Sequence, residues 1–402
     1  MKQVYIIDYI RTPIAKFQGG LSEVRADDLA AIVLKEIVKR NPQIPAEEIE
    51  DVILGCANQA GEDNRNVARM ASLLAEIPIK IGGETVNRLC ASGMAAIANA
   101  YRAIAIGEGE IYLAGGVEQM TRAPYVLSKS AQPFGRDVQL FDSSFGWRFV
   151  NPKMKELYGV DGMGETAENL AEIYKISREA QDEFALHSQQ KATSAQNSGR
   201  LAQEIVNVEV PQKKGEPKIF SEDEFVKPDT TLDKLAKLRP AFKKEGGSVT
   251  AGNSSGLNDG AAAMILASED AVKKYNLKPL AKIISSAVVG VEPRIMGIGP
   301  VEATKKALSR ANLSLEDMDI IELNEAFAAQ ALSVLQELGI DAKDERLNPN
   351  GGAIALGHPL GMSGTRIVGT AALELQKKNK KYALCTLCIG VGQGYAMIIE
   401  KI

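Results

Sequence analysis

Hydrophobic and polar positions in the first part of the chain alternate between two periodicities. Residues 3–8, 51–54 and 110–116 are short apolar runs typical of buried strands, whereas residues 26–40 carry apolar side chains at helical spacing. From residue 92 onward a segment is apolar on nearly all sides, which predicts a buried helix. Strands that alternate with helices in this way indicate an α/β fold in which helices cover a sheet.

The same alternation returns in the last third of the chain. After an apolar run at residues 261–266, strands are predicted at residues 282–289, 320–323, 382–387 and 395–399, and helices at residues 301–311, from Asn324 onward and up to Leu375. With a shift of about 270 residues, Ser92-Gly93 falls on Ser363-Gly364, and two of the predicted strands also coincide. This echo predicts that the chain contains a duplicated α/β unit.

The region between the two alternating parts is richer in charge and in turn residues. Within it, residues 164–192 are predicted to form two amphipathic helices, with Ser177 as the N-cap of the second. We therefore predict an N-terminal core at residues 1–120 that residues 248–272 complete, an inserted loop domain at residues 121–247 and a C-terminal core at residues 273–402.

Charge and composition narrow the possible classes of protein. The formal net charge of −4 argues against general affinity for nucleic acid or for an anionic membrane, because both require a basic face. No uninterrupted apolar run approaches the roughly 18 residues of a membrane span. The first residues open on a strand rather than on a signal-peptide pattern. We expect a cytoplasmic protein without nucleic-acid or membrane partners.

The cysteines Cys56, Cys90, Cys385 and Cys388 are too few to staple a chain of 402 residues, and we expect free thiols. Cys385 and Cys388 form a C-x-x-C pair, which could suggest a redox pair or half of a zinc site. The chain has no second such pair, and both histidines lie far away in sequence. We therefore expect no metal site.

The position of Cys90 in the sequence favours a reactive thiol. It lies at the N-terminal end of the helix predicted from residue 92, where unpaired N–H groups and the positive end of the helix dipole stabilise a thiolate. The position predicts a nucleophile with a lowered pKa, and a buried structural cysteine is the alternative. Cys56 is expected to be structural.

Glycines are concentrated in residues 348–366, more densely than a helix or strand that serves stability alone would tolerate. They are typical of a backbone that turns tightly around something. His358, between Gly357 and Pro359, is a candidate for a positioned imidazole, because histidine changes charge near neutral pH. A glycine-rich loop with an incidental histidine is the alternative. His187 is expected to lie at the surface or in packing.

Four motifs, in their order and spacing, resemble those of thiolases. They are N-R-L-C-A-S-G around Cys90, N-E-A-F-A-A-Q from Asn324, G-G-A-I-A-L-G-H-P-L-G-M-S-G-T-R around His358, and C-I-G-V-G-Q-G from Cys388. The resemblance covers nearly the whole chain and implies two βαβαβαββ core domains in α-β-α-β-α layers, with a loop domain inserted in the first. It also implies a homodimeric or homotetrameric acyltransferase that cleaves 3-oxoacyl-CoA thiolytically or runs the reverse Claisen condensation.

The resemblance implies a role for each site residue. Cys90 is similar to the acyl-accepting nucleophile, His358 to its activating base, and Cys388 to the acid/base that exchanges the α-proton of acetyl-CoA. Carbon–carbon cleavage needs both a nucleophile at the 3-keto carbon and a proton donor for the departing enolate. One oxyanion hole is implied to consist of His358 and a water held by Asn324, and the other of the N–H groups of Cys90 and Gly390.

Coenzyme A is implied as a substrate, and no tightly bound cofactor is expected. The residues that the resemblance assigns to its binding are mostly apolar or small: Met163, Phe242, Ala251, Ser255, Ala326 and Phe327. Lys227 and its neighbours would supply positive charge for the phosphates.

The sequence differs from one subgroup of thiolases at a position that bears on the preferred acyl chain. Biosynthetic thiolases specific for acetoacetyl-CoA have a histidine where this chain has Gly162, whereas residues 146–169 and Val391 most resemble the 3-oxoadipyl-CoA thiolases of aromatic degradation. The terminal carboxylate of such a substrate needs a cationic partner. Arg148 or Lys153 could supply it, and a structural ion pair is the alternative role for Arg148.

Other functions fit the residues less well. A β-ketoacyl synthase or hydroxymethylglutaryl-CoA synthase shares the fold, but the cysteine in C-I-G-V-G favours a thiolase. A non-catalytic thiolase-like lipid-binding protein would be expected to lack Cys90 or His358, and both are present. A scaffold role leaves the glycine-rich loops unexplained. A biosynthetic acetoacetyl-CoA thiolase stays open as an alternative.

Overall fold

Strands of the N-terminal half form one mixed sheet in the computed structural model, which describes residues 2–402. In spatial order they are β1 (Val4–Arg11), β10 (Asn258–Ser268), β5 (Ile111–Gln119), β3 (Asp51–Gly55) and β4 (Glu84–Val86), with β2 (Ala15–Lys16) also pairing with β10. The pairs β1–β10 and β10–β5 are antiparallel, and β5–β3 and β3–β4 are parallel. A strand from far along the chain thus lies between β1 and β5.

The C-terminal half repeats this pairing. Its strands are, in spatial order, β11 (Ala281–Gly290), β14 (Gln393–Lys401), β13 (Tyr382–Ile389) and β12 (Ile320–Leu323). Two antiparallel pairs are again followed by a parallel pair. The predicted duplication of an α/β unit is therefore confirmed. The two halves meet where Tyr5 and Ile6 of β1 pair with Lys282 and Ala281 of β11.

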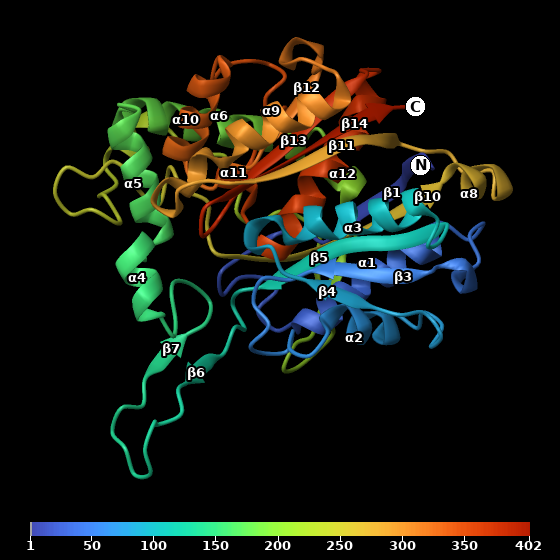
Figure 1. Cartoon of the computed structure of the whole chain (residues 1–402), viewed down its shortest axis with the longest axis horizontal. Helices are drawn as coiled ribbons and strands as arrows, with labels where there is room; N and C mark the ends of the chain where they lie inside the picture. The colour runs from blue at the N-terminus through green and yellow to red at the C-terminus, as the bar shows by residue number, and fades with distance from the viewer. Residues whose placement is uncertain (1) are drawn as a thin grey trace.

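Helices complete five layers, as predicted (Figure 1). The middle layer is formed by α3 (Ser92–Ile106) and α12 (Leu360–Lys378), which contact each other between the two sheet regions. One outer layer contains α1 (Ala26–Arg40) and α2 (Val67–Leu74), and the other contains α9 (Gly299–Ala311) and α10 (Ala328–Leu338). Two short helices, α8 (Glu269–Lys274) and α11 (Ala353–Leu356), lie in connections.

Small residues allow α3 and α12 to approach closely. A Cβ atom on Gly93 would lie 2.6 Å from the carbonyl oxygen of Gly361, and one on Gly364 would lie 2.3 Å from the backbone nitrogen of Met94. Only glycine fits where two backbones pack at this distance. The N-terminal ends of the two helices are thereby held side by side in the middle layer.

Between β5 and β10 the chain forms a region of smaller elements. They are β6 (Tyr125–Leu127), β7 (Leu140–Asp142), α4 (Pro152–Tyr158), α5 (Met163–Ile173), α6 (Arg178–Asn197), β8 (Val208–Val210), β9 (Lys218–Phe220) and α7 (Leu232–Ala236). Ser177 caps α6, as predicted, by accepting a hydrogen bond from the N–H of Ala180. The antiparallel pair β6–β7 forms an arm that projects from the body (Figure 1). Phe134, midway between the two strands in sequence, is fully exposed.

Buried ion pairs tie this region to both halves. Arg11 of β1 donates to Glu204 at 2.7 Å and to both carboxylate oxygens of Asp223 at 2.7 and 2.8 Å. Arg200 donates to Glu204 at 3.0 Å and to Glu374 of α12 at 2.9 Å. All five side chains are buried, so each charge is neutralised by a partner rather than by water.

One element boundary expected from the sequence was wrong. The helix expected to open at Asn324 begins at Ala328, because the N–H of Asn324 donates to the carbonyl of Thr386 and continues the sheet contact of β12. The window Leu89–Ile106 is long and apolar enough to cross a membrane by length and composition, but 67% of it is buried inside the fold. Its apolar character is explained by its place between the sheets.

Candidate active site

Cys90 lies in the 3₁₀ turn Leu89–Ala91 that leads into α3. The backbone N–H groups of Gly390 and of Cys90 itself point to its sulfur. Two non-glycine residues in the left-handed region stand beside these groups: Leu89, with φ of 47°, precedes Cys90, and Val391, with φ of 64°, follows Gly390. Such conformations are strained and are found at functional sites.

The predicted low pKa of Cys90 is wrong for the free protein. Burial raises the pKa of Cys90 to about 11, and the two backbone N–H groups offset only part of that rise. The thiol is only 8% exposed. Loss of solvation penalises the thiolate more than the helix end stabilises it. A thiol at this position needs a base before it can act as a nucleophile.

His358 lies in the turn between α11 and α12. Its backbone N–H donates to Oδ1 of Asn258 at 2.9 Å. The preceding Gly357 has φ of 103°, and a Cβ there would lie 2.6 Å from the amide of Asn258, so the turn requires glycine. Nδ1 of the ring lies 2.6 Å from Oγ of Ser363, and Nε2 lies 3.4 Å from Nδ2 of Asn324. The imidazole is held on both sides.

Burial, and to a smaller extent the positive charge of Arg366, lower the pKa of His358 to about 3. The ring is 4% exposed. His358 is therefore neutral near pH 7, and one of its ring nitrogens carries a lone pair.

The other predicted site residues of the C-terminal half converge on the same place. Asn324 follows β12, and its Oδ1 is buried and has no hydrogen-bond partner among residues 2–402. Cys388 is fully buried near the end of β13, and its pKa is raised by this burial and, to a smaller extent, by the nearby Cys90. Cys385 bonds instead to the carbonyl of Ile367 at 3.5 Å. Residues three apart on a strand face opposite sides, so the C-x-x-C sequence does not form a pair.

Most residues predicted to bind coenzyme A surround one apolar cluster. Cys388, Ala326 and Phe327 are members of it, and Met163 packs against it. The sulfur of Met163 lies 3.6 Å from the position that a Cβ on Gly390 would take.

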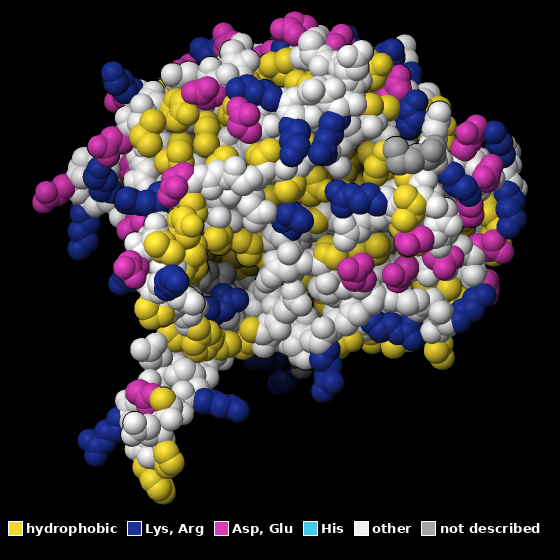
Figure 2. Space-filling model, in the orientation of Figure 1, with side chains coloured by type: hydrophobic (Ala, Val, Ile, Leu, Met, Phe, Trp, Pro, Cys, Tyr) yellow, Lys and Arg dark blue, Asp and Glu magenta, His cyan; other side chains and the backbone are white. Residues whose placement is uncertain are grey.

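Phe242 and Phe327 meet edge to face, with ring centroids 6.0 Å apart. The N–H and Oγ of Ser255 both lie 3.0 Å from the carbonyl of Ala326, and Ala251 is exposed nearby in sequence. Figure 2 shows a hollow in the face where the arm joins the body, with apolar and basic side chains around it.

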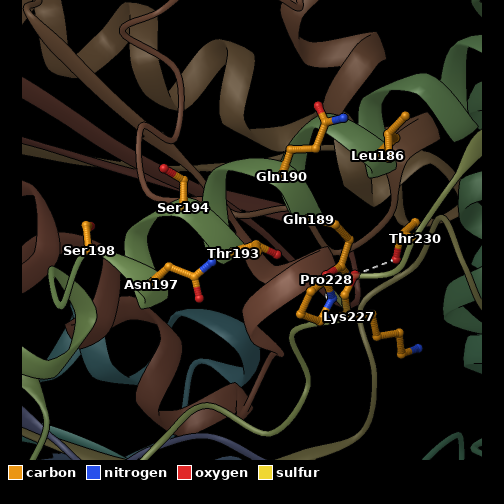
Figure 3. A pocket seen from close by; sticks show the side chains of 10 residues that line it. All are labelled: Leu186, Gln189, Gln190, Thr193, Ser194, Asn197, Ser198, Lys227, Pro228 and Thr230. Atoms are coloured by element: carbon orange, nitrogen blue, oxygen red, sulfur yellow. Dashed lines mark hydrogen bonds between the residues drawn. The ribbon is translucent and has the colours of Figure 1, made fainter.

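Lys227 lies apart from this cluster, at a pocket of about 550 Å³ formed by α6 and residues 227–230 (Figure 3). Its ammonium lies 4.8 Å from the ring centroid of Phe225, and it forms no ion pair with a carboxylate of residues 2–402. The other lining side chains are mainly polar: Gln189, Gln190, Thr193, Ser194, Asn197 and Thr230.

The residues predicted to meet the acyl chain are less buried. The guanidinium of Arg148 donates to the carbonyl of Ser143 at 3.3 Å and forms no ion pair within residues 2–402. The expected alternative of a structural ion pair within the chain is therefore absent there. Trp147, its neighbour, donates to the carbonyl of Asp161 at 3.3 Å, next to Gly162 and Met163. Lys153 is exposed, and His187 is half-buried on α6.

Glu118 was missed by the sequence reasoning, although a glutamate that follows the apolar run of β5 was a signal for it. It is 1% exposed and accepts hydrogen bonds from the N–H groups of Ala57, Asn58 and Gly361 at 3.0, 2.9 and 2.8 Å. Burial raises the pKa of Glu118 to about 7, against the effect of these three bonds. The carboxylate thereby anchors the first turn of α12 beside His358.

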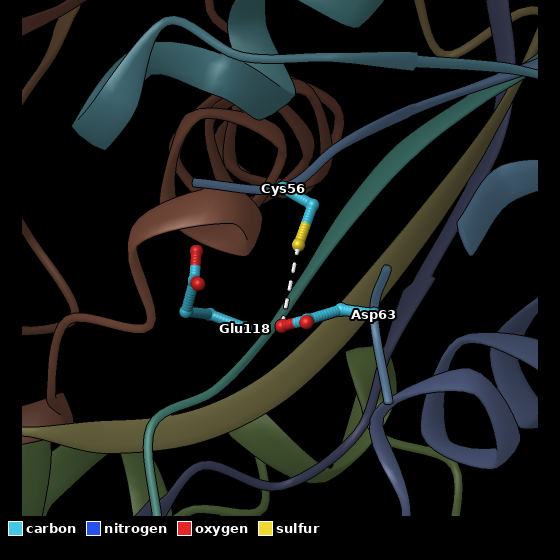
Figure 4. A group of neighbouring side chains, drawn as sticks. All are labelled: Cys56, Asp63 and Glu118. Carbon is cyan, nitrogen blue, oxygen red and sulfur yellow. Dashed lines mark hydrogen bonds between the residues drawn. The ribbon is translucent and has the colours of Figure 1, made fainter. Parts of the chain in front are cut away.

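Cys56, Asp63 and Glu118 have ligand atoms within 4.8 Å of one another (Figure 4). Their contacts are those of a hydrogen-bonded cluster. The thiol of Cys56 donates to the carbonyl of Asn58 at 2.8 Å, and the Glu118 carboxylate points to the first turn of α12. Burial raises the pKa of Cys56 well above its usual value, which agrees with its expected structural role.

Comparison with known proteins gives the same family for the whole chain. The family models "Thiolase, N-terminal domain" and "Thiolase, C-terminal domain" match residues 4–270 and 277–401. The chain is 58% identical to the 3-oxoadipyl-CoA/3-oxo-5,6-dehydrosuberyl-CoA thiolase of Escherichia coli (strain K12) over 402 residues, which cover all of both chains.

Solved structures agree with this result. The acetyl-CoA acetyltransferase of Bacillus anthracis is 42% identical, with a TM-score of 0.93 over 100% of this chain and 99% of that one. Human mitochondrial 3-ketoacyl-CoA thiolase in complex with CoA is 43% identical, with a TM-score of 0.91 over 100% and 98%. The resemblance inferred from the four motifs is confirmed, and the chain belongs to the thiolase family of acyltransferases.

Proposed function

We propose that this thiolase cleaves 3-oxoacyl-CoA to acetyl-CoA and a shortened acyl-CoA through an acyl intermediate on Cys90. The observation that carries the proposal is that the turn of Cys90 packs against α12, the helix that follows His358, while Asn324 faces His358 and Cys388 lies near Cys90. A nucleophile, a neutral base and a second proton donor at one place are what carbon–carbon cleavage requires.

In the first half-reaction, Nε2 of His358 takes the proton of Cys90, and the thiolate attacks the 3-keto carbon. The tetrahedral oxyanion collapses, the bond between C2 and C3 breaks, and the enolate of acetyl-CoA takes a proton from Cys388. In the second half-reaction, the thiol of coenzyme A gives its proton to the Cys388 thiolate and attacks the thioester. Cys90 then leaves and receives the proton that His358 holds.

Donors for the negative oxygens are available on both sides. The N–H groups of Cys90 and Gly390 converge at the sulfur and form one oxyanion hole. Protonated His358, with a water that the unpartnered Oδ1 of Asn324 holds, forms the other. The strained turns at Leu89 and Val391 aim the first pair of N–H groups.

Coenzyme A serves as a substrate, and the protein holds no tightly bound cofactor. Met163, Phe242, Ala251, Ser255, Ala326 and Phe327 contact its pantetheine arm. Lys227, which has no carboxylate partner within residues 2–402, meets its phosphates. Residues 1–120 with 248–272, 121–247 and 273–402 act as the three domains, and the enzyme works in the cytoplasm.

A homodimer or homotetramer is proposed, and the projecting arm is the candidate contact between copies. Tyr125, Leu127, Phe134 and Leu140 expose from 65% to 102% of their surface along the arm. Large apolar side chains exposed to this extent on a thin hairpin favour contact with another chain.

We further propose 3-oxoadipyl-CoA as the preferred substrate. The relative at 58% identity is named a 3-oxoadipyl-CoA thiolase, and Gly162 disfavours an acetoacetyl-CoA thiolase. The guanidinium of Arg148 forms no ion pair within residues 2–402, and the donors that its bond to the Ser143 carbonyl leaves unused can hold the terminal carboxylate with two hydrogen bonds. A non-catalytic lipid-binding protein is disfavoured because Cys90, His358 and Cys388 are all present at one place.

A panel of 3-oxoacyl-CoA thioesters tests both proposals through loss of their absorbance. We expect Arg148→Leu to lower kcat/KM for 3-oxoadipyl-CoA about ten- to a hundredfold, the size of a charged hydrogen bond, and to leave 3-oxohexanoyl-CoA nearly unchanged. Lys153→Leu is the matched control and should affect neither. Equal loss on both substrates would mean that Arg148 supports the fold, and turnover by Cys90→Ala at the wild-type rate would overturn the mechanism.

A further inference from the structure

Ser363, in the first turn of α12, contacts the ring of His358 directly. Its side chain is buried, and its Oγ lies 2.6 Å from Nδ1 of His358. The same Oγ donates to the carbonyl of Pro359 at 2.8 Å. The hydroxyl therefore stands between a ring nitrogen and a backbone carbonyl.

Counting protons decides which ring nitrogen carries the hydrogen. A serine hydroxyl has one hydrogen, and a carbonyl can only accept. Because that hydrogen goes to Pro359, Ser363 presents only lone pairs to the ring, and Nδ1 of His358 must be the donor. The lowered pKa leaves the neutral ring with a single proton, so Nε2 keeps a lone pair.

The surroundings of Nε2 fit this assignment. Nδ2 of Asn324, a donor, faces Nε2 at 3.4 Å. The backbone that carries the ring is fixed as well, because the N–H of His358 donates to Asn258 and the N–H of Gly361 donates to Glu118. Ring and hydroxyl are thus held in one arrangement before any substrate arrives.

We infer that Ser363 is the positioning residue that fixes His358 as the Nδ1–H tautomer. The inference rests on the proposed role of His358 as the base for Cys90. With its lone pair on Nε2, the ring can take the thiol proton without first moving a hydrogen. Once Nε2 is protonated, Ser363 still accepts from Nδ1–H, and the new Nε2–H becomes a donor to the oxyanion.

The chain has only two histidines, His187 and His358, so the tautomer can be read directly. Protein labelled with ¹⁵N-histidine should show two imidazole groups by NMR, and His187→Gln assigns one of them without touching the site. For His358 we expect a protonated Nδ1 and an unprotonated Nε2 in the wild-type protein at pH 7. A protonated Nε2 in the wild-type spectrum would overturn the inference, and this measurement needs no variant at Ser363.

Two variants at the serine complete the test. Ser363→Ala should populate the Nε2–H tautomer and lower kcat about tenfold or more at unchanged KM, because the base is then wrongly protonated. Ser363→Thr keeps the hydroxyl and should retain the wild-type tautomer. An alanine variant with the wild-type nitrogen shifts, or a threonine variant with the alanine pattern, would refute the assignment.

The tautomer is measured without turnover, so its failure is distinct from failure of the proposed mechanism. That mechanism fails if His358→Gln forms the acyl-enzyme at the wild-type rate.

Discussion

The helices α3 and α12 occupy equivalent places in the two halves of the chain, yet they present different chemistry at their N-terminal ends. Each carries a serine in its first turn. Ser92 donates to the carbonyl of Leu89 at 2.7 Å and accepts from the N–H of Arg88 at 2.9 Å, so it serves only the backbone. Ser363 also bonds to a backbone carbonyl, but it additionally meets the ring of His358. The duplication therefore gives two equivalent helices. Cys90, just before α3, is the proposed nucleophile, and His358, just before α12, is the proposed base.

The largest effects on activity should come from two single variants, one that removes Cys90 from the N-terminal half and one that removes Cys388 from the C-terminal half. Cys90→Ala should lower kcat by at least about 10⁴-fold, because no acyl intermediate can form. Cys388→Ala should still form acyl-Cys90 from a simple acyl-CoA, since transfer to sulfur needs no α-proton exchange, but it should fail in condensation. Intact-protein mass spectrometry and a condensation assay distinguish the two. Condensation by Cys388→Ala at the wild-type rate would reduce Cys388 to a core residue.

The pH dependence of alkylation tests whether α3 lowers the pKa of its thiol. With a pKa of about 11 for Cys90 and a neutral His358, the thiolate fraction rises tenfold for each pH unit. Inactivation by iodoacetamide should therefore accelerate about a hundredfold from pH 7 to pH 9. Peptide mapping should find the label on Cys90 before Cys56 or Cys385, which are fully buried. An inactivation rate that does not change with pH would instead support the low pKa of Cys90 that was predicted from the sequence.

The contact between the two helices can be broken sterically. Gly364→Val places side-chain atoms where the backbone of Met94 already lies, and it should lower the free energy of unfolding by about 2 kcal/mol or more. Gly290→Ala is the control, because the nearest atom to its new Cβ is 3.9 Å away. Urea denaturation measures both. Equal stability of the two variants would show that the helices can separate without loss.

The smallest effect is expected on stability, from replacing the two residues with positive φ in the site, Leu89 and Val391. Val391 is 40% exposed with φ of 64°, so Val391→Gly should raise the free energy of unfolding by about 1 kcal/mol by relieving strain. Leu89→Gly relieves similar strain but removes a side chain that packs on the core, and it should lower stability. Thermal unfolding compares the two. A loss of stability in Val391→Gly would mean that its turn is unstrained.

Local patterns predicted much of the fold and the main site residues. The boundaries of α1 and β12 and the cap of α6 follow from periodicity and from Ser177, all of which are properties of neighbouring residues. Cys90 and His358 were visible because a helix end and a glycine-rich stretch mark them locally.

Contacts between distant residues could not be predicted in this way. Glu118 bonds to Gly361, 243 positions away, and no periodicity in the chain reports that pairing. The prediction of a lowered pKa for Cys90 was wrong for a related reason. The helix end is a local feature, whereas the burial that outweighs it places Cys90 in a core cluster with residues of both halves. The same holds for Asn324, which bonds to β13 instead of opening a helix.

The ion pairs around Arg11 limit how this chain can be shortened or recombined. Both carboxylates that neutralise Arg11, Glu204 and Asp223, come from the region between β5 and β10, and so does Arg200, the partner of Glu374. Excising that region would leave a bare cation on β1, and breaking a single buried pair already costs about 3–5 kcal/mol. The region therefore cannot be treated as a detachable cassette, and a chimaera that exchanges it must carry the acceptors for Arg11 along with it.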